Sequence, residues 1–287
     1  MTVVTTFYPM FDFTRQVVQD HGDVSLLIPA GTEPHDFEPS AQMIAQIEDA
    51  DVFVYNSDDM ETWVPSALEA IDQDKVTIIN ASEGITFLEG DADEDEHHHD
   101  DDDHDDHEEE GHSHAVDPHV WLDPVLAQDE VTTIAEGLAK ADPDNTDAYH
   151  ENAATYNEKL QALDDAFKTA FDGAENREFV TQHAAFAYLA KRYDLTQVAI
   201  SGLSPESEPS PAKLAELTDF VQEHDVHYIY YEENASSAIA ETLANEVGVE
   251  LLVLSPIEGV SQEDQDAGMD YIKVMEANLD ALKKTIQ

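Results

Sequence analysis

Three histidines of this 287-residue chain lie in sequence contexts that suit a metal ligand. His35 lies in the proline-bounded loop 31–39, His119 lies in a turn bracketed by two prolines, and His183 directly follows a strand-like run. Neutral imidazole suits zinc and other transition metals, whereas sites built from carboxylates alone suit calcium, magnesium and manganese. Three imidazoles need only a water or a carboxylate to complete a four-coordinate zinc site. We therefore predict these three residues as metal ligands.

The spacing of the three histidines is weak support by itself. Separations of 84 and 64 residues match no compact zinc motif, so ordinary core or surface histidines remain an alternative interpretation. However, His35 and His183 follow predicted strands, and ligands of open α/β sheets bind beyond the carboxyl ends of the strands. This placement favours a binding role.

Short apolar, β-branched runs alternate with helix-like segments along both halves of the chain. This pattern predicts two α/β lobes, each doubly wound around a mainly parallel four-stranded sheet. The predicted strands are 3–6, 24–28, 51–55, 76–79, 179–181, 197–200, 228–231 and 251–254. The predicted helices are 11–20, 40–49, 62–71, 184–193, 212–224, 236–247 and 265–284.

A longer helical pattern separates the two halves. Apolar residues recur at helical spacing from Tyr149 to Phe171, with Pro143 before them and Gly173 after them. A single helix here would be about 40 Å long and would act as a stiff spacer. The alternative is that it belongs wholly to the core of one lobe. We predict an N-terminal lobe over 1–143, a linking helix over 144–173 and a C-terminal lobe over 174–287.

Residues 89–114 interrupt the first lobe with an acidic, histidine-rich segment that contains almost no apolar residues. Burial cannot offset the entropy of ordering such a segment, so we expect a mobile surface loop. Its imidazoles would form a set of weak metal sites at high local concentration, although a merely solvated acidic loop is the alternative. These histidines are His97, His98, His99, His104, His107, His112 and His114.

The chain is strongly acidic, with 65 Asp and Glu against 12 Lys and Arg and a net charge of −53. Without the 14 acids of residues 91–110 the charge is still −39, so the acidity covers the whole surface. This charge excludes nucleic-acid binding, which needs a basic surface. Because molar salt shortens the Debye length to about 3 Å, we hypothesise a halophilic, high-salt origin. Equal thermal stability at about 0.1 M and at molar salt would contradict that hypothesis.

The chain contains no cysteine, which excludes disulfides and thiolate metal sites. No apolar run is long enough to span a membrane, and the chain opens directly on a strand-like segment. Composition alone therefore leaves open a cytoplasmic protein and the mature part of a longer secreted precursor.

Five segments carry a family resemblance: 5–9, 31–39, 55–63, 117–124 (Asp-Pro-His-Val-Trp-Leu-Asp-Pro) and 183–193. In this order they resemble the metal-binding solute-receptor family of ABC importers, most closely its zinc-uptake branch, and the resemblance extends over essentially the whole chain. It implies two α/β lobes joined by a long rigid helix, with the metal in the cleft between them. It also implies that His35, His119 and His183 occupy the first three ligand positions.

The fourth ligand position of that family falls on Ser255, within residues 254–259. A serine hydroxyl is a poor zinc ligand, so we predict three histidines plus water, or plus a carboxylate such as Glu232 or Glu38. Manganese receptors of the family usually carry a carboxylate at the third position. The histidine at position 183 therefore favours Zn²⁺, with Mn²⁺ as the second choice.

The resemblance implies a monomeric receptor, not an enzyme, that captures the ion without chemistry. It would deliver the ion to a membrane permease from the extracellular face, tethered by a segment that this chain lacks. The alternatives are a zinc hydrolase, which also uses three histidines and an open water position, and a metal-buffering or adhesion protein on the same fold. The sequence lacks the His-Glu-x-x-His, Gly-x-Ser-x-Gly and P-loop motifs. Proton competition should weaken metal binding below about pH 6.5.

Overall fold

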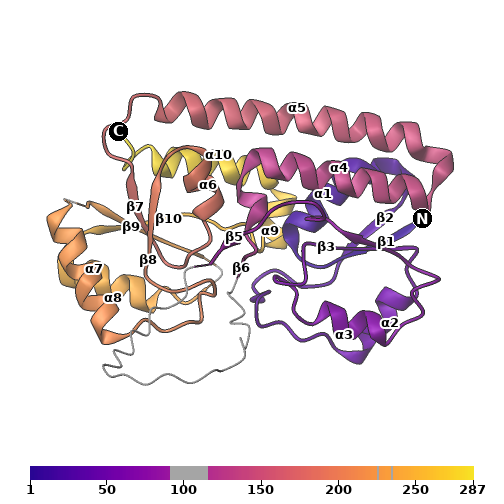
Figure 1. Ribbon diagram of the computed structural model, residues 1–287, viewed down its shortest axis with the longest axis horizontal. Helices are drawn as coiled ribbons and strands as arrows, with labels where there is room; N and C mark the ends of the chain where they lie inside the picture. The colour runs from indigo at the N-terminus through magenta and orange to yellow at the C-terminus, as the bar shows by residue number, and fades with distance from the viewer. Residues whose placement is uncertain (91–115, 225, 234) are drawn as a thin grey trace, which may run out of the picture.

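A computed structural model of the protein describes residues 1–90, 116–224, 226–233 and 235–287. Two lobes lie side by side, each built around a four-stranded sheet (Figure 1). Every strand pair in these two sheets is parallel. The predicted α/β class with two parallel four-stranded sheets is therefore confirmed.

The sheet of the first lobe has the order β2-β1-β3-β4. Its central strand β3 is buried at every position, because helices cover both faces of the sheet, and this explains its unbroken apolar sequence. The elements of this lobe are β1 (Thr2–Thr5), α1 (Tyr8–Val18), η1 (Gln19–His21), β2 (Asp23–Leu26), α2 (Ala41–Glu48), β3 (Val52–Tyr55), α3 (Val64–Glu69), β4 (Thr77–Asn80), the antiparallel pair β5 (Leu88–Glu89) and β6 (Val116–Asp117), η2 (Val120–Leu122), α4 (Pro124–Ala141) and η3 (Pro143–Asn145).

The sheet of the second lobe has the order β10-β9-β7-β8. The elements of this lobe are β7 (Glu178–Thr181), α6 (Ala187–Arg192), β8 (Thr196–Ala199), α7 (Pro211–Glu223), β9 (Tyr228–Tyr231), α8 (Ala238–Val247), β10 (Glu250–Val253), α9 (Gln262–Asp266) and α10 (Tyr271–Leu282). Each strand of this second sheet has its ends within one residue of a predicted strand, because short buried β-branched and aromatic runs mark parallel strands clearly.

Helix α5 (Thr146–Phe171) runs along both lobes (Figure 1). Its 26 residues correspond to about 39 Å. The hydroxyl of Tyr156 donates to Asp12 in the first lobe at 3.1 Å, and Asp164 accepts a hydrogen bond from Tyr193 in the second lobe at 3.2 Å. The helix is therefore anchored to both lobes and does not belong to one core alone.

The C-terminal helix predicted over 265–284 is wrong in one respect, because the structure breaks it into α9 and α10. Gly268 adopts a φ of +88° at the break, a left-handed conformation that ends a helix. Asp270 then caps α10 by accepting from the backbone N–H of Lys273 at 2.9 Å. The apolar periodicity belongs to α10 alone, because every residue of α9 is polar or charged, so the pattern did not support one helix reaching back to residue 265.

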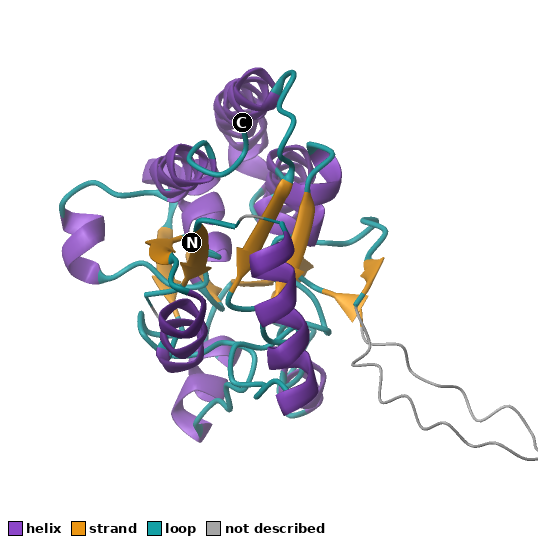
Figure 2. Cartoon of the chain, turned by 90° about the vertical axis from the view of Figure 1, so that its left-hand side faces the viewer, coloured by secondary structure: helices purple, strands orange, loops and turns teal. Residues whose placement is uncertain are grey.

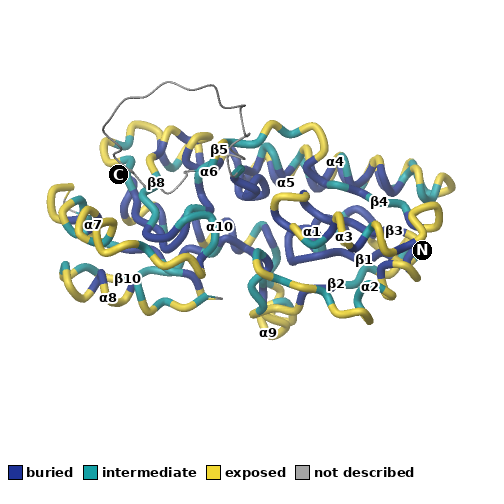
Figure 3. The backbone as a smooth tube through the Cα atoms, turned by 60° about the horizontal axis from the view of Figure 1, so that its bottom comes forward, coloured by how far each residue is buried: buried dark blue, intermediate teal, exposed yellow. Residues whose placement is uncertain are grey.

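The strands lie between layers of helices (Figure 2). The largest buried cluster extends from the first lobe through α5 into the second, while smaller clusters fill the space between each sheet and its outer helices. Helix α4 packs very closely on β4 at Gly137, where a Cβ atom would lie 2.3 Å from Ile79. Exposed residues line the outward sides of α7, α8 and α9 (Figure 3). Within the described ranges, no helix has both the length and the apolar character needed to cross a membrane.

Candidate metal centre

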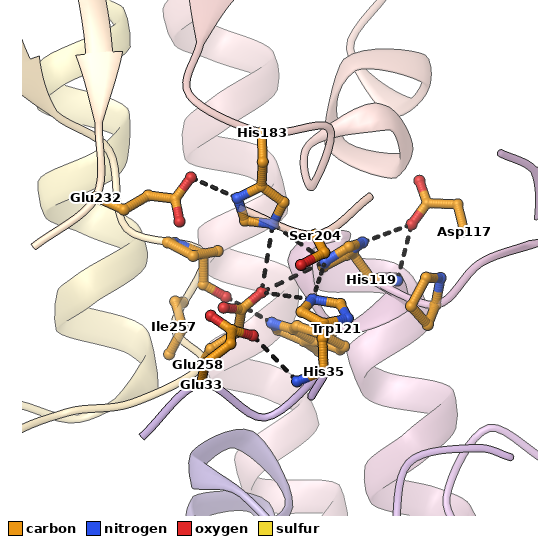
Figure 4. Close-up of polar contacts among 12 residues, drawn as sticks. Glu33, His35, Asp117, His119, Trp121, His183, Ser204, Glu232, Ile257 and Glu258 are labelled. Atoms are coloured by element: carbon orange, nitrogen blue, oxygen red, sulfur yellow. Dashed lines mark hydrogen bonds and ion pairs between the residues drawn. The ribbon is translucent and has the colours of Figure 1, made fainter. Parts of the chain in front are cut away.

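Four side chains converge between the two lobes: His35, His119, His183 and Glu258. One ligand atom from each lies within 4.8 Å of all the others. His35 and His119 come from the first lobe, and His183 and Glu258 come from the second (Figure 4). The structure thus brings together the three histidines predicted from the sequence and adds a carboxylate that was not among the predicted candidates.

Each of these residues lies in a connection that follows a strand. His35 lies in the loop between β2 and α2, and His183 lies two residues after the last residue of β7. His119 lies between β6 and η2, in a turn whose backbone is limited by Pro118. Glu258 lies in the loop between β10 and α9. Strand ends therefore place His119 and His183 directly, and the longer loops after β2 and β10 bring His35 and Glu258 to the same point.

The ring nitrogens of the histidines point at one another and at the glutamate. The Nε2 atom of His119 lies 3.1 Å from that of His35 and 3.3 Å from that of His183. Glu258 Oε1 lies 3.3 Å from His35 Nε2, 3.4 Å from His119 Nε2 and 3.5 Å from His183 Nε2. Three nitrogens and one carboxylate oxygen therefore form one cluster of potential ligand atoms.

Two further carboxylates orient two of the histidine rings by contacting their Nδ1 atoms. His119 Nδ1 lies 2.7 Å from Asp117 Oδ1, and His183 Nδ1 lies 2.5 Å from Glu232 Oε1 (Figure 4). An ionised carboxylate only accepts hydrogen bonds, so each Nδ1 carries the proton and the Nε2 lone pair is directed at the shared point. This is the arrangement in which histidine ligates a metal.

The electrostatics of the cluster favour a cation. Burial alone raises the pKa of Glu258, but hydrogen bonds with His119, His183 and His35 outweigh it and hold that pKa well below its usual value. Burial lowers the pKa of His35. Burial also acts to lower the pKa values of His119 and His183. Their carboxylate partners outweigh burial, so both pKa values are raised. A positive charge shared among these groups, whether protons or a metal ion, therefore stabilises the cluster.

The predicted fourth-ligand candidates lie elsewhere. Glu232 contacts His183 at Nδ1, on the side of the ring away from the shared point. Glu38 is exposed. Ser255 donates its backbone N–H to Asn278 Oδ1 at 2.8 Å, and its Oγ accepts from the N–H of Ile257 at 3.1 Å. These three residues are not part of the four-residue cluster.

Glu258 could have been found from the sequence by the rule that supports His183. It follows a predicted strand, at the edge of the sheet where ligands bind in open α/β folds. The fourth ligand position of the family was aligned with Ser255, and Glu258, three residues later, was therefore not considered. The seven histidines of the acidic segment, His97, His98, His99, His104, His107, His112 and His114, lie outside the described residues.

Residues 3–285 match the family described as zinc-uptake complex component A, periplasmic. The chain belongs to this family. It is 55% identical over 284 residues to the high-affinity zinc uptake system protein ZnuA of Bacillus subtilis, covering 99% of this chain and 87% of that protein. It is 52% identical to the zinc-binding lipoprotein AdcA of Streptococcus pneumoniae over 99% of this chain, but it spans only 56% of AdcA.

Solved structures of family members share the fold. The metal-dependent lipoprotein YcdH of Bacillus subtilis aligns with a TM-score of 0.83 at 50% identity, covering 100% of this chain and 99% of that one. The Zn(II)-bound ZnuA-like domain of Streptococcus pneumoniae AdcA aligns with a TM-score of 0.83 at 48% identity, covering 100% and 98%. The laminin-binding protein Lmb of Streptococcus agalactiae, described as having adhesin and metal-transporting activity, aligns at 0.85 and 36% identity over 100% of both chains. The predicted family is thus confirmed.

Proposed function

We propose that this chain is the substrate-binding component of an ABC importer for zinc. It binds Zn²⁺ through the Nε2 atoms of His35, His119 and His183 and the carboxylate of Glu258. The convergence of these four ligand atoms from two lobes is the observation that carries the proposal. It is supported by membership of the zinc-uptake family and by the Zn(II)-bound state of a structural neighbour.

The chemistry of the ligand set suits zinc. Three imidazoles and one carboxylate give the four-coordinate arrangement that Zn²⁺ prefers, whereas Mn²⁺ prefers sites richer in oxygen ligands. With four protein ligands the ion has no open position for a reactive water, and catalytic zinc sites need such a position. The cluster therefore supports capture and release rather than hydrolysis.

The lobes explain how capture can be coupled to delivery. Two ligands belong to each lobe, so the ion bridges the cleft, and a small relative movement of the lobes would separate the ligand pairs. In our proposal the receptor works on the extracellular side of a membrane, as a tethered monomer, and passes Zn²⁺ to a permease. The description of Lmb as both adhesin and metal transporter supports adhesion as a second candidate function.

A competition titration with a chromophoric zinc chelator tests the proposal. The wild-type protein should hold one Zn²⁺ much more tightly than the chelator, and His183→Ala should lose that high-affinity site. His150→Ala is the matched control, because His150 is exposed on α5 and should leave the affinity unchanged. A variant without residues 91–114 separates the cleft from the histidine-rich segment. An affinity that His183→Ala leaves intact would refute the proposed site.

A further inference from the structure

Glu258 is carried by a loop with an unusual backbone conformation. It lies in the loop between β10 and α9, next to Ile257, whose φ of +63° is rare for a β-branched residue. Such a conformation persists only when surrounding contacts hold it, and positions of this kind cluster at ligand-binding sites. The contacts that fix this loop therefore decide where the Glu258 carboxylate lies.

The start of this loop is attached to the second lobe. Asn278 on α10 clamps Ser255 through a hydrogen bond at each end of its side-chain amide, of 2.8 Å and 2.7 Å. Beyond this clamp, a cavity of about 700 Å³ borders the loop at Pro256, Gly259 and Val260. The loop therefore has space beside it into which it could relax.

Trp121 of the first lobe contacts this loop of the second lobe directly. It is fully buried, and its indole Nε1–H donates to the carbonyl oxygen of Pro256 at 2.8 Å. Its own carbonyl accepts the hydroxyl of Tyr271 at 2.5 Å, and its ring packs on Phe7 at 4.9 Å. The first contact holds the Trp121 backbone, and the second limits the position of its ring.

Trp121 thus connects the two lobes at the metal centre. It lies two residues after His119, and the carbonyl that it binds lies two residues before Glu258. The ring also lies 5.2 Å from the His119 ring. A hydrogen bond from the turn that carries one ligand therefore fixes the loop that carries another.

We infer that Trp121 is a positioning residue that holds Glu258 against the bound zinc ion through the carbonyl of Pro256. This inference rests on the proposed function. Without the indole hydrogen bond, the strained Ile257 backbone can relax toward the neighbouring cavity, and the glutamate leaves the ion. Trp121 thereby controls how long the receptor retains zinc.

The test is the rate of zinc release to excess chelator, measured by stopped flow on the zinc-loaded protein. Trp121→Phe keeps an aromatic ring and removes the N–H donor, and it should accelerate release about tenfold, the lower end of what loss of an outer-shell partner costs. Trp63→Phe is the matched control: the Trp63 indole nitrogen has no hydrogen-bond partner among the described residues, so release should match the wild type.

A double-mutant cycle separates positioning from general structural support. In a Glu258→Ala background, Trp121→Phe should change the release rate less than about twofold, because the residue through which it acts is gone. The same acceleration in both backgrounds, or none in the wild-type background, would overturn the inference. If Trp121→Phe does not fold, Tyr271→Phe removes the hydrogen bond that holds the Trp121 backbone and should show the same dependence on Glu258. A wild-type protein that does not retain zinc would instead contradict the proposed function.

Discussion

His119 and His183 lie with their Nε2 atoms 3.3 Å apart although 64 residues and two different lobes separate them. Each ring is oriented by a carboxylate on its Nδ1 atom, and both face the carboxylate of Glu258. Such an approach of ring nitrogens is favourable only when a positive charge lies between them. The relationship therefore indicates a site for a cation at this point.

Removal of Glu258 should have the largest effect of any carboxylate substitution. Glu258→Ala removes one of four ligand atoms and should weaken zinc affinity by about 100-fold or more, above the range for residues outside the ligand shell. A chelator competition titration measures this. Glu38→Ala is the control, because Glu38 is exposed, and equal affinities for the two variants would contradict the assignment of Glu258.

Glu232 should affect affinity without touching the metal. Glu232→Gln retains an acceptor for His183 Nδ1 but removes the negative charge that fixes the tautomer and makes the ring a stronger ligand. We expect zinc affinity to fall by about 10- to 100-fold with unchanged stoichiometry. Glu233→Gln, which changes an exposed neighbour, should have no effect. A loss of stoichiometry in Glu232→Gln would instead make Glu232 a direct ligand.

The fold was largely predictable because its signals are local. Short buried strands and the apolar stripe of residues 149–171 are visible in single segments, and α5 indeed occupies Thr146–Phe171. The break at Gly268 was missed, although the wholly polar residues 262–266 and the glycine itself both indicate that a helix ends there. Local periodicity predicts an element more reliably than it predicts where that element ends.

The site was partly predictable for a different reason. His35, His119 and His183 stand out because histidines are few outside the acidic segment and these three have distinctive neighbours. Glu258 does not stand out among 65 acidic residues, and its role depends on a loop conformation that composition does not encode. The partners on Nδ1, Asp117 and Glu232, likewise depend on three-dimensional contacts. Glu232 was predicted close to the site as a possible fourth ligand, and the structure places it against His183 Nδ1.

The stability of the metal-free protein should fall with rising pH through the titration of Asp12. Burial, reinforced by Asp270, raises the pKa of Asp12 to about 6. The folded state therefore binds this proton more tightly than the unfolded state, whose Asp pKa is about 3.9. The stabilisation is complete below about pH 4 and is lost as the pH rises through about 6.

Asp12→Asn removes this titration. The decrease in the free energy of unfolding between pH 4 and pH 7 should be smaller in the variant by about 2–3 kcal/mol, measured by urea denaturation in the presence of a chelator. The comparison with wild type at each pH removes the shared effect of the high net charge. Identical pH profiles for the two proteins would contradict the raised pKa.

The ion pair between Asp123 and Arg192 should stabilise the contact between the lobes. Asp123 Oδ2 lies 2.8 Å from Arg192 Nε and 2.7 Å from Nη2, and Asp123 also caps α4 through the N–H of Val125. Asp123→Ala should lower the free energy of unfolding by about 2–3 kcal/mol, because it removes a helix cap and leaves a partly buried guanidinium unpaired. Asp129→Ala, on an exposed part of α4, should change it by less than about 0.5 kcal/mol.

X-ray absorption at the zinc edge tests the central claim most directly. The sample is the full chain loaded with slightly less than one equivalent of Zn²⁺, so that the tightest site is filled first. We predict a four-coordinate ion with three imidazole nitrogens and one carboxylate oxygen at about 2.0–2.2 Å, and the loss of one imidazole in His183→Ala. A spectrum with fewer than three imidazoles, or one that His183→Ala leaves unchanged, would contradict zinc capture in the cleft between the lobes.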